Sequence, residues 1–127
     1  MPTTLPHLLI GERDPFMQRT LAQALKEHCE LTFVEDGAAL LAQAHEKPPD
    51  LIILELLLPT LDGFQVCRRL KNDPATRGIP VLVFTLLAAE ARALQAGADG
   101  FLQKPLRPQT LLEEIRRLLA TRGKPNA

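Results

Sequence analysis

Charged and hydroxyl-bearing side chains follow four of the short apolar runs in this sequence. They are Glu12 and Arg13 after "HLLIG", Glu55 after "LIIL", Thr85 after "VLVF" and Lys104 after "GFLQ". A pocket of several carboxylates with a single lysine attracts a divalent cation, because such cations prefer oxygen ligands. Here the charges of the two glutamates, the arginine and the lysine cancel, so we expect cation binding at this pocket to be weak or absent.

These residues can meet only if the apolar runs are neighbouring strands of one sheet. The runs alternate with segments of helical periodicity, which is typical of βαβ units. Strands are predicted at residues 7–11, 31–34, 51–54, 81–84 and 100–103, and helices from Pro15, at 38–47, 64–71 and 88–96, and from Pro108. The run "LIIL" is apolar at every position, as expected of a central parallel strand with helices on both faces. The sequence therefore predicts an α/β fold with a doubly wound, five-stranded parallel sheet.

Local signals support the first helix and the core. Asp14 before Pro15 predicts a helix N-cap followed by proline at the first helical position. Phe16, Leu21 and Leu25 recur at helical spacing after it and predict an apolar stripe. The two cysteines, Cys29 and Cys67, lack metal or disulfide spacing, and we interpret both as small core residues.

The polar residues after the strands should share one crevice. In doubly wound sheets, functional sites lie at the carboxyl ends of the strands. We therefore expect Glu12, Glu55, Thr85 and Lys104 to line a single site.

From Leu8 to about Leu119 the chain resembles the receiver domain of bacterial two-component response regulators. The resemblance rests on "LLIGERDP", "PDLIILELLLPTLDGFQVCRRLK", Thr85 and "AGADGFLQKPL". It implies the flavodoxin-like fold, with an aspartate after the third strand that accepts a phosphoryl group from a histidine kinase beside a bound magnesium ion.

The same resemblance assigns roles to four further residues. It places the phosphoryl-binding hydroxyl and lysine on Thr85 and Lys104, and the switch aromatic on Phe101, for which packing in the core is the alternative. It also implies a cis peptide bond before Pro105.

Two positions depart from the family pattern. Glu55 stands in the place of the phosphoacceptor aspartate, and Arg13 replaces one of two acidic residues after the first strand, leaving Glu12. A guanidinium group can hold a carboxylate with two hydrogen bonds, so we expect Arg13 to pair with Glu55. The extra methylene of glutamate moves its carboxylate by roughly 1 Å, which can cost on the order of a hundredfold in rate. We therefore expect no useful phosphoryl transfer and no enzymatic activity.

Bulk properties exclude several classes of protein. The chain has 127 residues, with 15 basic and 15 acidic side chains, so no overall field favours nucleic acid or a membrane surface. No apolar run is long enough to span a bilayer. We expect one cytoplasmic domain at residues 1–122, a short tail at 123–127 and no output domain.

The preferred hypothesis is a stand-alone pseudo-receiver that acts through a signalling protein partner without phosphorylation. Its pocket would be locked by Arg13, Glu55 and Lys104, and homodimer formation is left open. One alternative is a working magnesium-dependent phosphoacceptor. A flavin-binding enzyme on the same fold is the other, although no Ser/Thr/Gly-rich phosphate loop follows the first strand. The interval from Thr85 to Lys104 is short for the family, which predicts an altered partner surface or ordinary variation in loop length.

Overall fold

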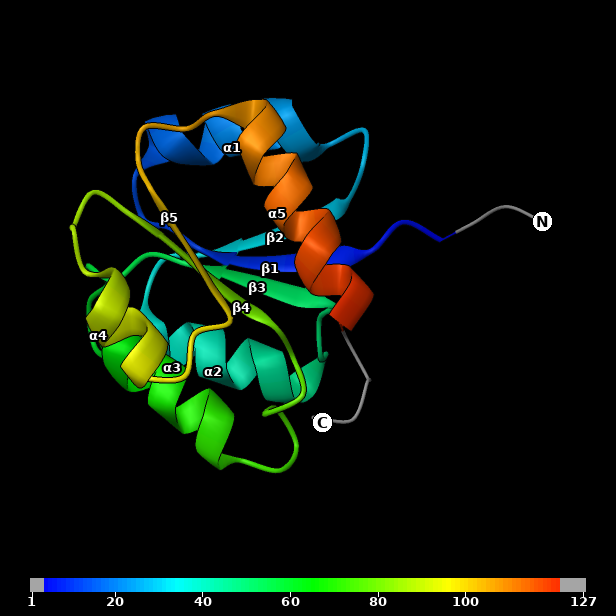
Figure 1. Ribbon diagram of the computed structural model, residues 1–127. Helices are drawn as coiled ribbons and strands as arrows, with labels where there is room; N and C mark the ends of the chain where they lie inside the picture. Colours follow the sequence, from blue (N-terminus) through cyan, green and yellow to red (C-terminus); the bar gives the residue numbers. More distant parts are fainter. Residues whose placement is uncertain (1–3, 122–127) are drawn as a thin grey trace.

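The computed structural model describes residues 4–121 as a three-layer α/β fold (Figure 1). A parallel sheet of five strands, in the order β2-β1-β3-β4-β5, lies between two layers of helices. The strands are β1 (His7–Gly11), β2 (Glu30–Val34), β3 (Leu51–Leu54), β4 (Val81–Thr85) and β5 (Gly100–Gln103). The helices are α1 (Pro15–Leu25), α2 (Gly37–Glu46), α3 (Gly63–Asn72), α4 (Glu90–Gln95) and α5 (Pro108–Thr121). The predicted doubly wound sheet is confirmed.

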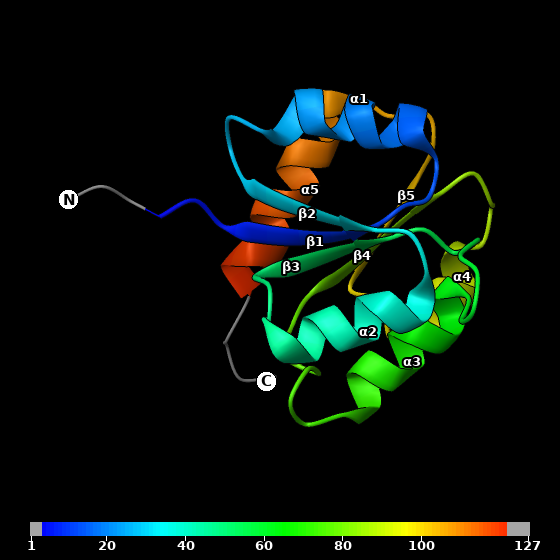
Figure 2. The ribbon, with the colours of Figure 1, turned by 180° about the vertical axis from the view of Figure 1, so that it is seen from behind.

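Each face of the sheet has its own hydrophobic cluster. Helices α1 and α5 cover one face, and α2, α3 and α4 lie on the other, as Figures 1 and 2 show from opposite sides. Strand β3 supplies both clusters, because successive side chains of a strand point to opposite faces. Ile52 and Leu54 belong to the α2/α3/α4 cluster, whereas Leu51 and Ile53 belong to the α1/α5 cluster. This double burial explains why "LIIL" is apolar throughout.

Aspartate side chains cap three of the helices at their N-termini. The carboxylate of Asp14 accepts a hydrogen bond from the Phe16 N–H, and Pro15 occupies the first turn, as predicted. Asp36 caps α2 in the same way, and Asp62 forms a capping box with Gln65 at α3. These bonds satisfy backbone N–H groups that have no partner within the helix.

Two predictions from helical periodicity were wrong in part. Phe16 does not belong to the buried stripe of α1, because its side chain is 66% exposed while Leu21 and Leu25 are fully buried. Phe16 therefore points away from the sheet, whereas its neighbour Met17 packs against the α1/α5 cluster. Helix α4 is shorter than the predicted 88–96: it spans Glu90–Gln95, and Ala89 at its N-cap makes no side-chain hydrogen bond.

The remaining core predictions hold. Cys29 and Cys67 are buried, and burial raises the pKa of the Cys67 thiol to about 11.

Among residues 4–121 there is no helix with the length and apolar character needed to cross a membrane. The tail expected at 123–127 lies outside the described residues.

The N-terminus of α2 packs tightly against the loop between β3 and α3. A Cβ atom added at Gly37 would lie 2.1 Å from the carbonyl oxygen of Leu61, which is backbone and cannot rotate away. Thr60, in the same loop, adopts a φ of 67° and donates its hydroxyl hydrogen bond to Asp36. The two segments therefore form one unit at the edge of the sheet.

We expect Gly37→Ala to lower the free energy of unfolding by about 3 kcal/mol, because the added methyl group must displace backbone. Urea denaturation followed by circular dichroism measures this change. Gly78→Ala is the matched control, since no atom lies within 4 Å of a Cβ there. Equal effects of the two substitutions would contradict the close packing at Gly37.

Candidate functional site

Strand register brings the predicted polar residues to one edge of the sheet. Gly11 at the end of β1 pairs with Leu54 at the end of β3, and Thr85 of β4 pairs with Gln103 of β5. The ladder continues one residue further, because the Glu55 N–H donates to the Gly11 carbonyl at 3.0 Å and the Lys104 N–H donates to the Thr85 carbonyl at 2.7 Å. Side chains at these positions consequently start from neighbouring strands.

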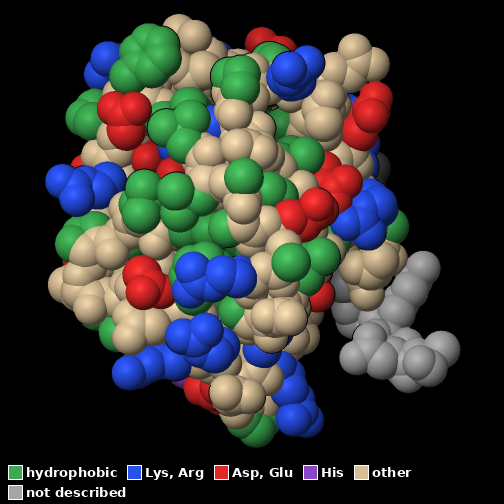
Figure 3. All heavy atoms as spheres, turned by 60° about the vertical axis from the view of Figure 1, so that its left-hand side comes forward, with side chains coloured by type: hydrophobic (Ala, Val, Ile, Leu, Met, Phe, Trp, Pro, Cys, Tyr) green, Lys and Arg blue, Asp and Glu red, His purple; other side chains and the backbone are tan. Residues whose placement is uncertain are grey.

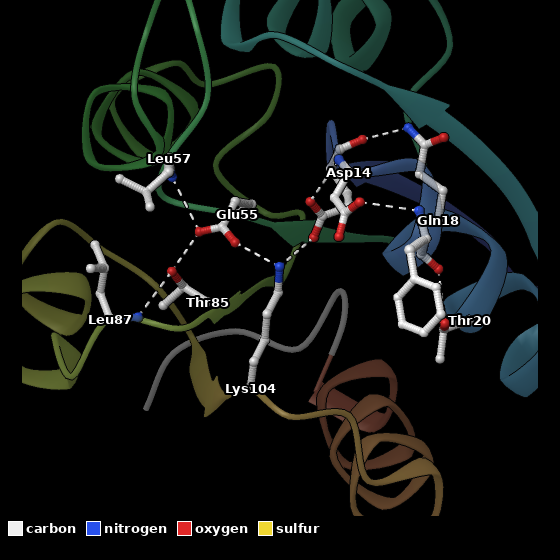
Figure 4. A network of polar contacts seen from close by, with 10 residues as sticks. Asp14, Gln18, Thr20, Glu55, Leu57, Thr85, Leu87 and Lys104 are labelled. Atoms are coloured by element: carbon white, nitrogen blue, oxygen red, sulfur yellow. Dashed lines mark hydrogen bonds and ion pairs between the residues drawn. The ribbon is translucent and has the colours of Figure 1, made fainter.

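The Lys104 ammonium group bridges two buried carboxylates (Figure 4). Its Nζ donates to Oε1 of Glu12 at 2.7 Å and to Oε2 of Glu55 at 2.8 Å. The side chains of the three residues are at most 8% exposed. Charge-assisted hydrogen bonds of this kind are stronger than neutral ones, and these bonds tie β5 to β1 and β3.

The other oxygen of Glu55 is also occupied. Its Oε1 accepts a hydrogen bond from Oγ1 of Thr85 at 2.5 Å and another from the Leu57 N–H at 3.1 Å. Thr85 is fully buried. Both carboxylate oxygens of Glu55 are therefore engaged by donors from three different segments of the chain.

These contacts set the protonation states of Glu55 and Lys104. Burial by itself raises the pKa of Glu55, but hydrogen bonds from Lys104, Thr85 and Leu57 outweigh burial and hold this pKa below its ordinary value. Burial lowers the pKa of Lys104, and the two glutamates outweigh it and raise the pKa above its ordinary value. Both side chains are therefore charged at neutral pH.

The predicted pairing of Arg13 with Glu55 is wrong. Arg13 is exposed, and its side chain makes no hydrogen bond or ion pair with residues 4–121. Glu12 turns inward to Lys104, so the next side chain of this extended segment points to the opposite side. Lys104 pairs with Glu55 in place of the arginine. Without Arg13 in the pocket, the buried groups Glu12, Glu55 and Lys104 together carry one net negative charge, whereas the sequence predicted that the charges would cancel.

Some parts of the site could not be read from side-chain types. The N–H groups of Leu57 and Asp14 donate to Glu55 and Glu12, and any residue type except proline could supply them. The Phe84 ring centroid lies 5.5 Å from the Lys104 ammonium nitrogen, close enough for a cation–π contact. An aromatic residue just before Thr85 was the only sequence signal for that contact.

Phe101 and Pro105 lie before and after Lys104 in the chain. The Phe101 side chain is half-buried and packs against the α2/α3/α4 cluster. The peptide bond between Lys104 and Pro105 is cis, as predicted.

The carboxylates in this arrangement do not fit a divalent cation. Such an ion needs several oxygen ligands, but Glu12 and Glu55 share Lys104, and the Asp14 carboxylate caps α1. Among residues 4–121, no group of three or more His, Cys, Asp or Glu side chains is arranged to hold a metal ion. Arg13 occupies the place of a second acidic residue in the family pattern, so one of the carboxylates that the family pattern offers to a magnesium ion is missing.

Comparison with known proteins identifies the class. Residues 8–116 match the family described as the response regulator receiver domain. The response regulator PleD of Caulobacter vibrioides is 40% identical over 114 residues, which are 87% of this chain and 25% of PleD. Protein PilH of Pseudomonas aeruginosa is 31% identical over 120 residues, covering 91% of this chain and 99% of PilH. The chain spans only a quarter of PleD, and almost the whole of PilH.

A solved structure agrees with this result. The receiver domain of a signal transduction histidine kinase from Syntrophus aciditrophicus is 32% identical, with a TM-score of 0.87 and 96% of each chain covered. The chain belongs to the response regulator receiver domain family, and its class of function is two-component signalling.

We expect Glu55→Gln to lower the free energy of unfolding at pH 7 by about 2 kcal/mol, because the negative charge opposite Lys104 is lost and the amide NH2 group must face one of the donors that hold the carboxylate. The pKa of Glu55 is lower in the folded protein than in the unfolded chain, where it is 4.5. The charged carboxylate therefore stabilises the fold above pH 4.5, and this stabilisation is lost as the pH falls through the pKa of the folded state. The difference between wild type and variant should therefore shrink below pH 4.5. Urea titrations at a series of pH values measure it.

Glu27→Gln, at an exposed glutamate in the turn after α1, is the control and should change little at any pH. A difference between Glu55→Gln and wild type that stays constant from pH 7 to pH 3 would contradict the assignment of a charged Glu55.

Proposed function

We propose that this receiver domain signals through a protein partner without being phosphorylated, with Glu55 acting as a fixed charge. The observation that carries the proposal is the engagement of both Glu55 oxygens by Thr85, Leu57 and Lys104. An acceptor carboxylate must offer a free oxygen to the incoming phosphorus atom. A carboxylate held by three donors, with a lowered pKa, is a weak nucleophile.

The charge of the pocket also disfavours phosphoryl transfer. The buried groups Glu12, Glu55 and Lys104 sum to one negative charge, and a phosphoryl donor is itself anionic. Metal ions normally stabilise the charge of the transferring group by several kcal/mol. With Arg13 in an acidic place of the family pattern, we propose that magnesium binding is weak or absent.

The Thr85 contact supports a second part of the proposal, that Glu55 mimics a phosphorylated acceptor. In the family, the hydroxyl at this position binds the phosphoryl group, and here the Thr85 hydroxyl donates to Glu55 instead. Arg13 does not draw the carboxylate away, because it points to solvent. The Phe101 side chain is half-buried against the α2/α3/α4 cluster. We propose that Thr85 and Phe101 are held in an active-like state.

Exposed leucines after β3 and β4 and on α4 support action through a protein partner. Leu57 follows β3, Leu86 and Leu87 follow β4, and Leu94 lies on α4; these side chains are 37% to 67% exposed. Figure 3 shows the face on the α4 side, where hydrophobic side chains gather across the middle among charged ones. Apolar side chains grouped on a surface commonly mark protein interaction sites.

Incubation with acetyl phosphate and magnesium, followed by intact mass spectrometry, tests phosphorylation. We expect no phosphoryl adduct on the wild type.

The double variant Arg13→Asp with Glu55→Asp restores the family's acids and should gain magnesium binding, measured by calorimetry. Arg19→Asp with Glu46→Asp, at exposed positions on α1 and α2, makes the same chemical changes and should gain none. An adduct on Glu55 of the wild type would establish the working phosphoacceptor instead.

Substitutions of Thr85 test the mimicry. Thr85→Ala removes the hydroxyl that binds Glu55, so the Phe101 ring resonances in a carbon–proton correlation spectrum should shift. Thr85→Ser keeps the hydroxyl and should leave them near the wild-type positions. If the two variants shift Phe101 alike, or if neither shifts it, Thr85 does not hold Phe101 in place.

A further inference from the structure

A cavity of about 180 Å³ lies between the end of the sheet and α5, on the face covered by the α1/α5 cluster. Its lining comes from β4, from β5 and the loop after it, and from the first turn of α5: Phe84, Leu102, Gln103, Pro105, Leu106, Arg107, Thr110 and Leu111. None of the three residues of the charged network, Glu12, Glu55 and Lys104, lines this cavity.

The floor of the cavity is apolar and its rim is polar. Phe84 and Leu111 are at most 2% exposed and form the deep part, while Leu102 and Leu106 are half-buried. The rim residues Arg107 and Thr110 are exposed, and their side chains make no hydrogen bond or ion pair with residues 4–121. Small-molecule sites commonly combine apolar walls with a few polar groups that orient the ligand.

Size and charge narrow the class of ligand. A volume of 180 Å³ is below the 300 Å³ or more of sites for drug-sized molecules, and it is close to an engineered apolar cavity of about 150 Å³ that binds benzene. One ring or one branched chain therefore fits. The guanidinium group of Arg107 matches a carboxylate, to which it can donate two parallel hydrogen bonds.

The cavity shares a wall with the charged network. Phe84 lines the cavity, and the centroid of the same ring lies 5.5 Å from the Lys104 ammonium nitrogen. Gln103 and Pro105, on either side of Lys104 in the chain, also line the cavity. A ligand in the cavity therefore lies against the ring and the segment that surround Lys104, which holds Glu12 and Glu55.

We propose that this cavity binds a small carboxylate bearing a single ring or branched apolar group, and that binding is transmitted through Phe84 to Lys104. The apolar part contacts Phe84 and Leu111, and the carboxylate pairs with Arg107. Ligand binding in this proposal is independent of whether Glu55 accepts a phosphoryl group, since neither Glu12, Glu55 nor Lys104 lines the cavity.

Titration of the nitrogen-15 labelled chain with benzoate, followed by amide correlation spectra, tests the site. We expect saturable shifts at Leu102, Leu106 and Thr110, with a dissociation constant on the order of 1 mM for so small a ligand. Shifts should extend to the Lys104 and Thr85 amides. Benzyl alcohol, which has the ring without the charge, should bind about fivefold more weakly.

Two pairs of variants provide the controls. Thr110→Phe fills the cavity and should abolish the benzoate shifts, whereas Gln109→Phe places the same ring on α5 outside the lining. Arg107→Gln should weaken benzoate about fivefold and leave benzyl alcohol unchanged. Arg116→Gln removes an exposed arginine elsewhere on α5 and should change neither.

Each result decides one part of the proposal. Absence of saturable shifts, or benzoate binding that survives Thr110→Phe, would overturn the site. Equal affinity for benzoate and benzyl alcohol would overturn the assignment of a carboxylate ligand. Shifts confined to the cavity residues, with Lys104 and Thr85 unmoved, would overturn the link to the charged network.

Discussion

The Lys104 ammonium group, held between the carboxylates of Glu12 and Glu55, is the interaction on which the site depends. Two buried carboxylates would repel each other and lose hydration without a cation between them, and the combined cost is several kcal/mol. Lys104 offsets this cost with two short hydrogen bonds. The same bonds leave Glu55 Oε1 free for Thr85 and Leu57, so the position of the lysine decides how the whole pocket is arranged.

The fold makes this arrangement possible through the register of parallel strands. Glu12, Glu55 and Lys104 each follow the last residue of a strand, and the strands end at the same edge. The helices contribute indirectly, because they bury both faces of β3 and exclude water from beneath the pocket. Exclusion of water strengthens the electrostatic interactions of the carboxylates.

Much of this could be predicted from the sequence, because the signals were local. The apolar run at β3, the Asp14-Pro15 cap and the polar residues after each strand depend on neighbours along the chain, and the structure confirms each of them. The partner of Glu55, in contrast, depends on the directions in which the Arg13 and Lys104 side chains point. Arg13 and Lys104 were both cations near the pocket, and only the alternation of side chains after β1 shows that Arg13 points outward. The exposure of Phe16 likewise depends on how the start of α1 is placed relative to the sheet, and helical periodicity carries no information about that placement.

The contact between Lys104 and Glu12 joins residues 92 positions apart in the chain. Contacts between residues so distant in sequence have a large loop-closure cost and form only after the intervening elements have assembled. We therefore expect the network to close late in folding, when β5 adds to β4. During synthesis, the carboxylates of β1 and β3 emerge long before their cation, so they stay hydrated until the last strand arrives. The pocket is therefore complete only when β1, β3, β4 and β5 lie together in the sheet.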